Sequence, residues 1–170
     1  MDLREYHPQL KRHPWELARV DTLRMLLLPF IDTRRSLTVL DIGCGDAFTS
    51  INIFRSWPEV FIEGIDIQLT GEQIIAFTRE YMRLTLYNSY EEIEGSFYDI
   101  ILLLDVLEHI EDDRGFLEWL IKRHLKRRGV VLITVPAFSS LFSRHDNILG
   151  HKRRYRIETL NCIIPTEIKM

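Results

Sequence analysis

Apolar and polar residues follow two different spacings along the chain, and these spacings predict strands and helices in turn. Short runs rich in Val, Ile and Leu predict strands over residues 37–42, 60–67, 84–88, 98–104 and 130–135. Helical spacing and helix-boundary residues predict helices over residues 14–29, 47–56, 71–81 and 114–127. Strands that alternate with helices indicate an α/β protein whose parallel sheet is covered on both faces.

Residues with strong positional preferences predict where several elements end. Thr70 precedes one predicted helix as its N-cap. The basic run 126–128, followed by Gly129, predicts a helix C-terminus there, because cations and glycine favour that end of a helix. Near the end of the chain, residues 157–164 predict one short helix that Pro165 ends.

Length and composition restrict the class of protein. The 170 residues fit one domain, with a helical entry segment (1–30), a core (36–136), a loop (137–156) and a tail (157–170). No apolar run reaches the roughly 20 residues of a membrane helix, and the N-terminus lacks a secretory signal. The two cysteines match neither a disulfide framework nor a zinc site, so we expect a cytoplasmic protein and predict no metal ion. The net charge of −3 makes nucleic acid an unlikely partner.

The first predicted strand runs into a glycine turn, V-L-D-I-G-C-G-D-A from Val39. A dinucleotide fingerprint would need glycine at position 48, where the chain has Phe48, and no phosphate-binding Gly-Lys-Ser/Thr follows. Gly43 and Gly45 leave bare backbone that a ligand can approach, and Asp41 adds a carboxylate just before them. The turn therefore favours a ligand with a cationic ammonium end and no diphosphate.

The second predicted strand ends at an acidic residue, Asp66. A carboxylate at this place in an α/β sheet accepts hydrogen bonds from the hydroxyl groups of a ribose. The alternative is a helix cap or a solvated loop residue. We favour the ribose interpretation from the spacing of Asp41 and Asp66.

Three segments in this order resemble the class I S-adenosylmethionine-dependent methyltransferases: V-L-D-I-G-C-G-D-A from Val39, G-I-D-I from Gly64 and Y-D-I-I-L-L-L-D-V-L-E-H-I from Tyr98. A bacterial small-molecule subgroup of that family is similar in two further segments, H-P-W-E-L-A-R from His13 and P-A-F-S-S-L-F-S-R-H-D-N-I-L-G-H-K-R-R-Y from Pro136. The resemblance implies a Rossmann-like three-layer sandwich with strand order 3-2-1-4-5. It also implies S-adenosylmethionine as cofactor and a small molecule as substrate.

The resemblance assigns cofactor contacts to residues at the strand ends. The methionine part would contact Asp41, Gly43, Cys44 and Gly45; the ribose, Asp66; and the adenine, Ile67 with Asn88 or Ser89. The sulfonium side would be lined by Leu104, Asp105 and Val106, with His109 close by. Asn88 departs from the acidic residue of many relatives. Ala47 replaces the third glycine of the family's turn, a change that we expect to be tolerated.

The reaction implied is attack on the methyl group by an oxygen, nitrogen or carbon nucleophile, which needs alignment and, for a protonated nucleophile, a base. The candidate bases are His109, His145, Asp146 and His151, because imidazole titrates near neutral pH and a carboxylate can be tuned toward it. The alternative is structural. Asp105 and Glu108 could cap the following helix, and His109 could be a packed side chain.

A basic loop follows the fifth predicted strand. We expect it to form a lid that binds an anionic group of the substrate, since arginine suits carboxylate and phosphate. The residues assigned to this role are Arg144, His151, Arg153, Arg154 and Tyr155. A solvated run of charge is the alternative.

The chain after Tyr155 is too short for the last two strands of the family's seven-stranded sheet, so we expect a truncated sheet of five strands. The run that begins at Val130 and ends at Val135 then becomes an apolar edge, which favours a homodimer, aggregation or cover by the tail. Three functions stay open: an active methyltransferase, a catalytically silent cofactor-binding or partner subunit, and a nucleotide-binding module of other chemistry.

Overall fold

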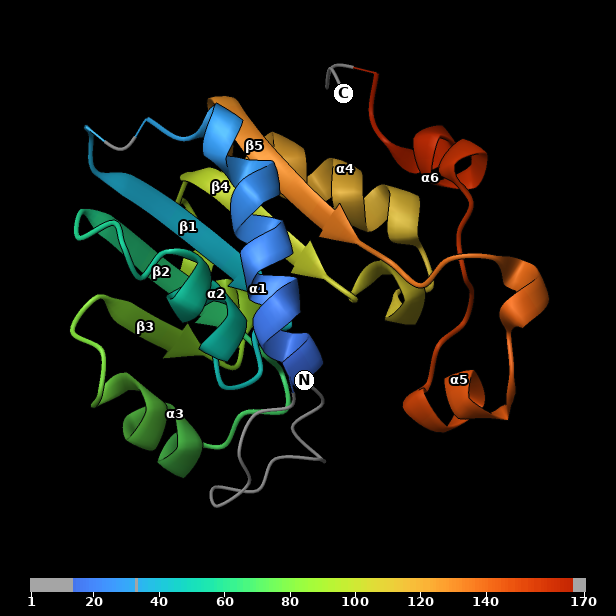
Figure 1. Ribbon diagram of the computed structural model, residues 1–170, viewed down its shortest axis with the longest axis horizontal. Coiled ribbons are helices and arrows are strands. Elements are labelled where there is room, and N and C mark those ends of the chain that lie inside the picture. Colours follow the sequence, from blue (N-terminus) through green and yellow to red (C-terminus); the bar gives the residue numbers. More distant parts are fainter. Residues whose placement is uncertain (1–13, 33, 167–170) are drawn as a thin grey trace.

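A computed structural model of the chain describes residues 14–32 and 34–166, so His13, the first residue of the segment H-P-W-E-L-A-R, lies outside the described residues. Five strands form one sheet: β1 Leu37–Ile42, β2 Val60–Ile65, β3 Leu84–Tyr87, β4 Tyr98–Leu104 and β5 Leu125–Thr134. The α-helices are α1 Pro14–Leu27, α2 Phe48–Ile53, α3 Gly71–Thr78, α4 Asp113–His124, α5 Arg144–Leu149 and α6 Ile157–Ile163. The short 3-10 helices are η2 Leu28–Phe30, η3 Tyr90–Ile93, η4 Leu107–His109 and η5 Ser139–Leu141. Helices and strands alternate as far as β5 (Figure 1).

The strand order is β3-β2-β1-β4-β5, and all four pairings are parallel. Ile42 pairs with Ile65 of β2 and with Leu103 of β4, so three strands end side by side. Parallel strands need crossover connections, and in this chain the connections place helices over both faces of the sheet. The predicted α/β fold and its strand order are confirmed.

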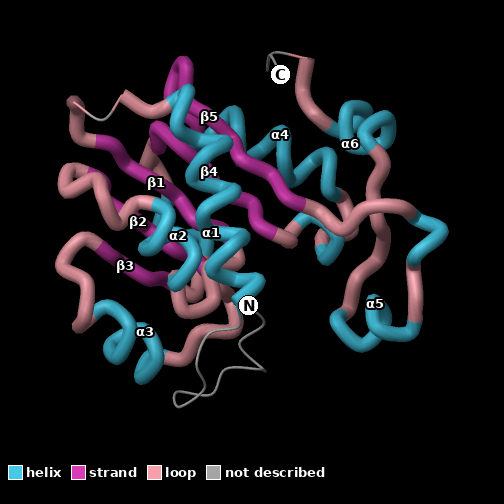
Figure 2. The backbone as a smooth tube through the Cα atoms, viewed as in Figure 1, coloured by secondary structure: helices cyan, strands magenta, loops and turns pink. Residues whose placement is uncertain are grey.

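Two buried clusters cover the two faces of the sheet. On one face, α1, α2 and α3 pack through residues such as Leu23, Ile53 and Phe77. On the other face, η3, α4 and α6 pack through Ile93, Leu117 and Leu160. Figure 2 shows the strands as a central layer with helices before and behind it. β4 is buried along nearly its whole length because both clusters contact it.

The boundary between α4 and β5 differs from the prediction. The helix ends at His124, and the strand begins at Leu125, which pairs with Tyr98. Lys126 lies in the strand because its ammonium donates to Asp99 Oδ2 at 2.9 Å, an ion pair with the neighbouring strand. Gly129 is therefore not a helix cap. The predicted N-cap Thr70 is confirmed, and it forms a capping box with Gln73.

The chain leaves the sheet after β5, forms η5 and α5 apart from it, and returns toward α4 (Figure 1). On the return, Tyr155 pairs with Ala137 in an isolated parallel bridge. The hydroxyl of Tyr155 donates to Asp113 Oδ2 at 2.7 Å, which fixes the returning segment on the start of α4. The predicted short tail helix is confirmed as α6. Among the described residues, β5 pairs with β4 only, so its other edge carries no strand.

Candidate functional site

The glycine turn after β1 takes backbone conformations that favour glycine. Gly43 and Gly45 have φ of 67° and 56°, in the left-handed region. The amide of Gly43 donates to the Ile65 carbonyl at 2.7 Å, which ties the turn to the end of β2. A Cβ on Gly43 would lie 2.9 Å from Cγ2 of Val106, so the turn also packs closely on the chain after β4.

Ala47 also has a positive φ, 58°, and immediately precedes α2. The structure thus places the replacement for the third glycine in a conformation that alanine adopts at some cost. Its methyl group is fully buried, which partly offsets that cost.

Asp66 connects the two turns at this edge of the sheet. Its Oδ2 accepts from the Gly45 amide at 3.1 Å, and its Oδ1 accepts from the Gln68 amide at 2.9 Å. The neighbouring Ile67 is 71% exposed, an apolar surface that a planar ring can cover. Asn88 donates to the Leu69 carbonyl at 3.2 Å and so lies beside the same loop, while Ser89 caps η3.

Asp41 is a buried carboxylate behind the glycine turn. Burial raises the pKa of Asp41 to about 6, and the nearby charge of Asp66 adds to this. A carboxylate whose negative charge is this poorly solvated is stabilised by a cation brought to the turn. The buried carboxylate of Asp41 therefore suits a ligand that brings a cationic ammonium to the turn.

The end of β4 faces the same turn and is held by α1. Asp105, with φ 59°, accepts from Arg19 Nη2 at 2.7 Å and from the hydroxyl of Thr134 at 3.0 Å. Arg19 Nη2 also donates to the hydroxyl of Thr134, at 2.9 Å. These contacts fix the backbone between Leu104 and Val106 next to Gly43.

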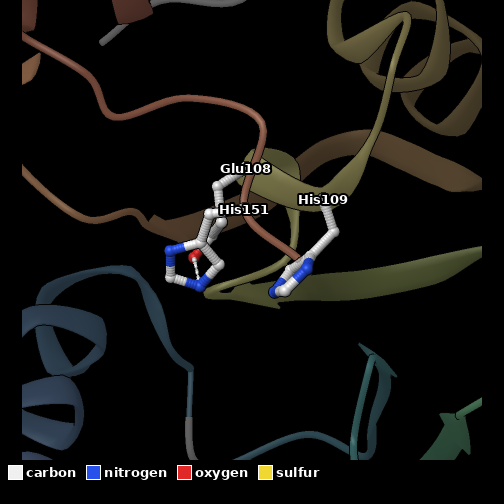
Figure 3. Close-up of side chains that lie close together, drawn as sticks. All are labelled: Glu108, His109 and His151. Atoms are coloured by element: carbon white, nitrogen blue, oxygen red, sulfur yellow. Dashed lines mark ion pairs between the residues drawn. The ribbon is translucent and has the colours of Figure 1, made fainter. Parts of the chain in front are cut away.

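Beyond Val106, η4 presents a carboxyl and an imidazole that meet a second imidazole from the returning segment. Glu108 and His109 lie on η4, and His151 lies on the returning segment; Figure 3 shows their side chains extending in the same direction. The ring centroids of His109 and His151 are 4.8 Å apart, and Nε2 of His151 lies 4.0 Å from Glu108 Oε1.

Glu108 is fully buried, and within the described ranges neither of its carboxylate oxygens has a hydrogen-bond partner. Burial raises the pKa of Glu108 to about 7, and the charge of Asp105 acts in the same direction. The structure does not use Asp105 or Glu108 as a cap of α4, because Asp112 takes that position.

Asp146 is buried among donors and holds the returning segment. Its carboxylate contacts Arg154 through Nε–Oδ1 at 2.8 Å and Nη2–Oδ2 at 3.1 Å, and Nδ1 of His151 lies 3.0 Å from Oδ1. The Ser143 amide and hydroxyl also donate to Oδ2. The Arg154 guanidinium holds the pKa of Asp146 well below its usual range.

Other residues of the basic loop are also engaged within the protein. Arg153 pairs with Asp113 at 2.9 Å, and the amide of Lys152 donates to the Glu108 carbonyl at 2.7 Å. Tyr155 is buried. Arg144 and His145 are exposed on α5, which lies apart from the sheet in Figure 1. The structure thus brings His109 and His151 together and leaves His145 and Arg144 outside their cluster.

Sequence reasoning gave no site role to Arg19 or Glu108. Arg19 stands within a helical pattern, and nothing local indicates that it reaches Asp105. Glu108 had one available signal, its position directly before His109 at the end of an apolar strand.

A family model described as a methyltransferase domain matches residues 12–165. The chain belongs to this family. Ubiquinone biosynthesis O-methyltransferase of Rickettsia bellii is 29% identical over 100 residues, which cover 58% of this chain and 41% of that protein. The chain thus spans less than half the length of this curated relative.

Solved structures agree with the fold of the methyltransferase domain. An O-methyltransferase family protein from Burkholderia thailandensis has a TM-score of 0.59 and 15% identity, over 87% of this chain and 52% of that chain. Coclaurine N-methyltransferase, bound to N-methylheliamine and S-adenosylhomocysteine, has a TM-score of 0.58 and 15% identity, over 74% of this chain and 38% of that chain. The membership predicted from the sequence is confirmed, and S-adenosylmethionine is the cofactor that it implies.

None of the described helices is both long and apolar enough to cross a membrane.

Proposed function

We propose that this methyltransferase domain transfers a methyl group from S-adenosylmethionine to an oxygen of a small-molecule acceptor. The observation that carries the proposal is the meeting of three strand ends, where the glycine turn, Asp66 and the β4 terminus face one another. The curated relatives are O-methyltransferases, which supports oxygen as the accepting atom.

The residues at these strand ends have distinct roles in the proposal. Asp41 and the backbone of Gly43, Cys44 and Gly45 hold the methionine part, and Asp66 accepts from the ribose hydroxyls. Ile67 covers an adenine face, and Asn88 with Ser89 lies at the adenine edge. S-adenosylmethionine, when bound, supplies a methyl group already activated by a positively charged sulfur. The Leu104 carbonyl, Asp105 and Val106 line the sulfur side, where partial negative charge is favourable.

The acceptor approaches over η4 in this proposal. The side chains there that can accept the acceptor's proton, or hydrogen-bond to it and weaken its bond to oxygen, are Glu108, His109 and His151. Asp146 is better placed as a positioning residue for His151 than as a base, because five donors already surround its carboxylate. His145 is not part of the proposed base, since it is exposed on α5.

The contacts of the loop revise the expected lid. Arg153 and Arg154 pair with Asp113 and Asp146, so their charges are already compensated. The hydroxyl of Tyr155 is also used internally. We therefore propose that the main role of the loop is to position His151. The loop contacts the acceptor through its exposed residues, and Arg153 and Arg154 do not form an anion-binding site.

The open edge of β5 favours pairing with a second copy of the chain. Sedimentation over a wide range of protein concentration tests this pairing. A monomer at every concentration would contradict it. Cys44 and Cys162 are both free thiols. A cytoplasmic setting and a small molecule, not a nucleic acid, as acceptor remain part of the proposal.

Calorimetric titration with S-adenosylmethionine and S-adenosylhomocysteine tests the cofactor site, and transfer of a labelled methyl group to a broad panel of small molecules with hydroxyl groups tests the reaction. The variant Asp66→Ala should lose most of the affinity for the cofactor, whereas Glu80→Gln, on an exposed turn after α3, should keep it. Binding without transfer to any acceptor would favour the silent subunit. Absence of binding by folded protein would overturn the proposal.

A further inference from the structure

Glu108 carries a buried carboxylate that the described residues leave without a hydrogen-bond donor. A carboxylate removed from water needs hydrogen-bond donors or a positive charge, and its burial without them is costly. Glu108 is 0% exposed and lacks a hydrogen-bond partner anywhere in residues 14–32 and 34–166. The nearest ion-pair partner, Nε2 of His151, is 4.0 Å away, beyond hydrogen-bonding distance.

The side chains around Glu108 offer the remaining ligands of a metal ion. One ligand atom from each of Glu108, His109 and His151 can be chosen so that all lie within 4.8 Å of one another. Tetrahedral zinc with bonds of about 2.0–2.2 Å holds its ligand atoms roughly 3.3–3.6 Å apart. Metal binding would therefore require the His109 ring and the Glu108 carboxyl to rotate inward and close this difference.

The orientation of His151 fits metal binding. Its Nδ1 faces the carboxylate of Asp146 at 3.0 Å, and a carboxylate only accepts, so Nδ1 carries the proton. The other nitrogen, Nε2, then has its lone pair available and is the one that faces Glu108. A carboxylate that holds the rear nitrogen of a histidine is the usual outer partner of a metal-binding imidazole.

We propose that Glu108, His109 and His151 bind one divalent transition-metal ion of the zinc type, with Asp146 as the outer partner of His151. Two imidazoles and one carboxylate suit such an ion better than magnesium or calcium, which prefer oxygen. Asp105 is not a fourth ligand, because Arg19 and Thr134 occupy its two oxygens. Three protein ligands leave a coordination position open, as in catalytic sites.

The position of this ion deepens the proposed function and rests on it. An acceptor hydroxyl at the open position loses its proton more easily, because a metal lowers the pKa of a bound oxygen. As the methyl carbon bonds to that oxygen, its bond to sulfur breaks, and the electron pair stays on sulfur to give S-adenosylhomocysteine. The acceptor's proton passes to solvent.

Metal-free protein, prepared with a chelator, is titrated with Co²⁺ by visible absorption and with Zn²⁺ by calorimetry. We expect one ion per chain and the intense absorption of four-coordinate Co²⁺. His151→Ala and His109→Ala should each weaken binding by at least tenfold, and Asp146→Asn by about 10–100-fold. His145→Ala, which changes an exposed histidine on α5, should leave the affinity unchanged.

Circular dichroism of each variant checks the fold, and His109→Ala keeps the test valid if Glu108 or His151 variants unfold, because His109 is exposed. Unchanged affinity in folded His109→Ala and His151→Ala, or no saturable binding by the folded wild type, would overturn the metal site. Titration of the same metal-free protein with S-adenosylmethionine separates the two proposals. Cofactor binding without metal binding refutes only the metal site, and the reverse refutes only the cofactor site.

Discussion

Oδ1 of Asp146 and Nδ1 of His151 lie 3.0 Å apart, and the same carboxylate also binds the guanidinium of Arg154. One buried charge therefore fixes an imidazole that faces Glu108 and an arginine that would otherwise extend into solvent. The contact joins α5 to the segment that returns past η4.

Asp146→Asn should loosen this segment. The amide cannot compensate the Arg154 charge, so we expect a lower Tm and faster amide exchange around residues 143–154. Because the folded pKa is depressed, the carboxylate stabilises wild type above its unfolded pKa of about 3.9, and this stabilisation is lost as pH falls below that value. Hydrogen exchange and thermal melts at pH 7 and pH 3 measure both effects. Arg144→Ala on the same helix is the control, and equal protection in wild type and Asp146→Asn would refute the prediction.

Asp41 should destabilise the free protein at neutral pH. Its folded pKa is about 6, above the unfolded value of about 3.9, so stability falls as pH rises between these values. Asp41→Asn removes the buried charge and should raise the free energy of unfolding at pH 7.5, by at most about 3 kcal/mol. At pH 4 the gain should be much smaller. Urea unfolding at the two pH values measures it, and a gain that does not depend on pH would contradict a buried charge as its cause.

The same substitution should weaken binding of S-adenosylmethionine, because the cofactor's ammonium loses its nearby carboxylate. Stability and affinity then change in opposite directions in Asp41→Asn. Calorimetry at pH 7.5 measures the affinity, and the wild type should approach the variant as pH falls below about 6. Equal affinity at pH 7.5 would place the ammonium elsewhere.

Gly43→Ala should damage the turn. The left-handed backbone costs an alanine about 1–2 kcal/mol, and the new methyl group meets Val106 at 2.9 Å. We expect this loss of stability together with at least a tenfold loss of cofactor affinity. Gly71→Ala is the matched control, since nothing lies within 4 Å of its added carbon. Denaturant titration and calorimetry on both variants decide the point, and similar behaviour of the two would count against a special role for Gly43.

Glu108→Met should stabilise the metal-free fold. The replacement fills a similar volume and removes an unpartnered buried carboxylate, a change of about 1–3 kcal/mol. Thermal melts in chelator should therefore show a higher Tm than the wild type. A lower Tm would mean that the carboxylate has stabilising partners in solution.

The sequence predicts an element correctly where the local residues alone determine its ends. β1 and β4 begin and end where predicted, because Gly43 follows the first apolar run and Asp105 follows the second. The predicted end of α4 was wrong because Lys126 lies in β5, where it forms an ion pair with Asp99 of the neighbouring strand. Local sequence carries no sign of such a partner.

The residues of the candidate site also differ in how far the local sequence predicts their positions. Most of the proposed cofactor residues lie at the ends of β1, β2 and β4, which the apolar runs of the sequence locate, and the structure places these strand ends side by side. The pairing of Asp146 with Arg154 and the approach of His151 to Glu108 depend on how the chain returns after α5. A run of basic residues looks alike whether its charges face solvent or a buried aspartate.

The bridge between Ala137 and Tyr155 brings the two ends of residues 138–154 together just beyond the end of β5. An excursion closed at its base can lengthen, shorten or change composition without displacing the strands that carry the glycine turn. In the proposed function this segment contacts the acceptor, so binding of the methyl donor and contact with the acceptor depend on different parts of the chain.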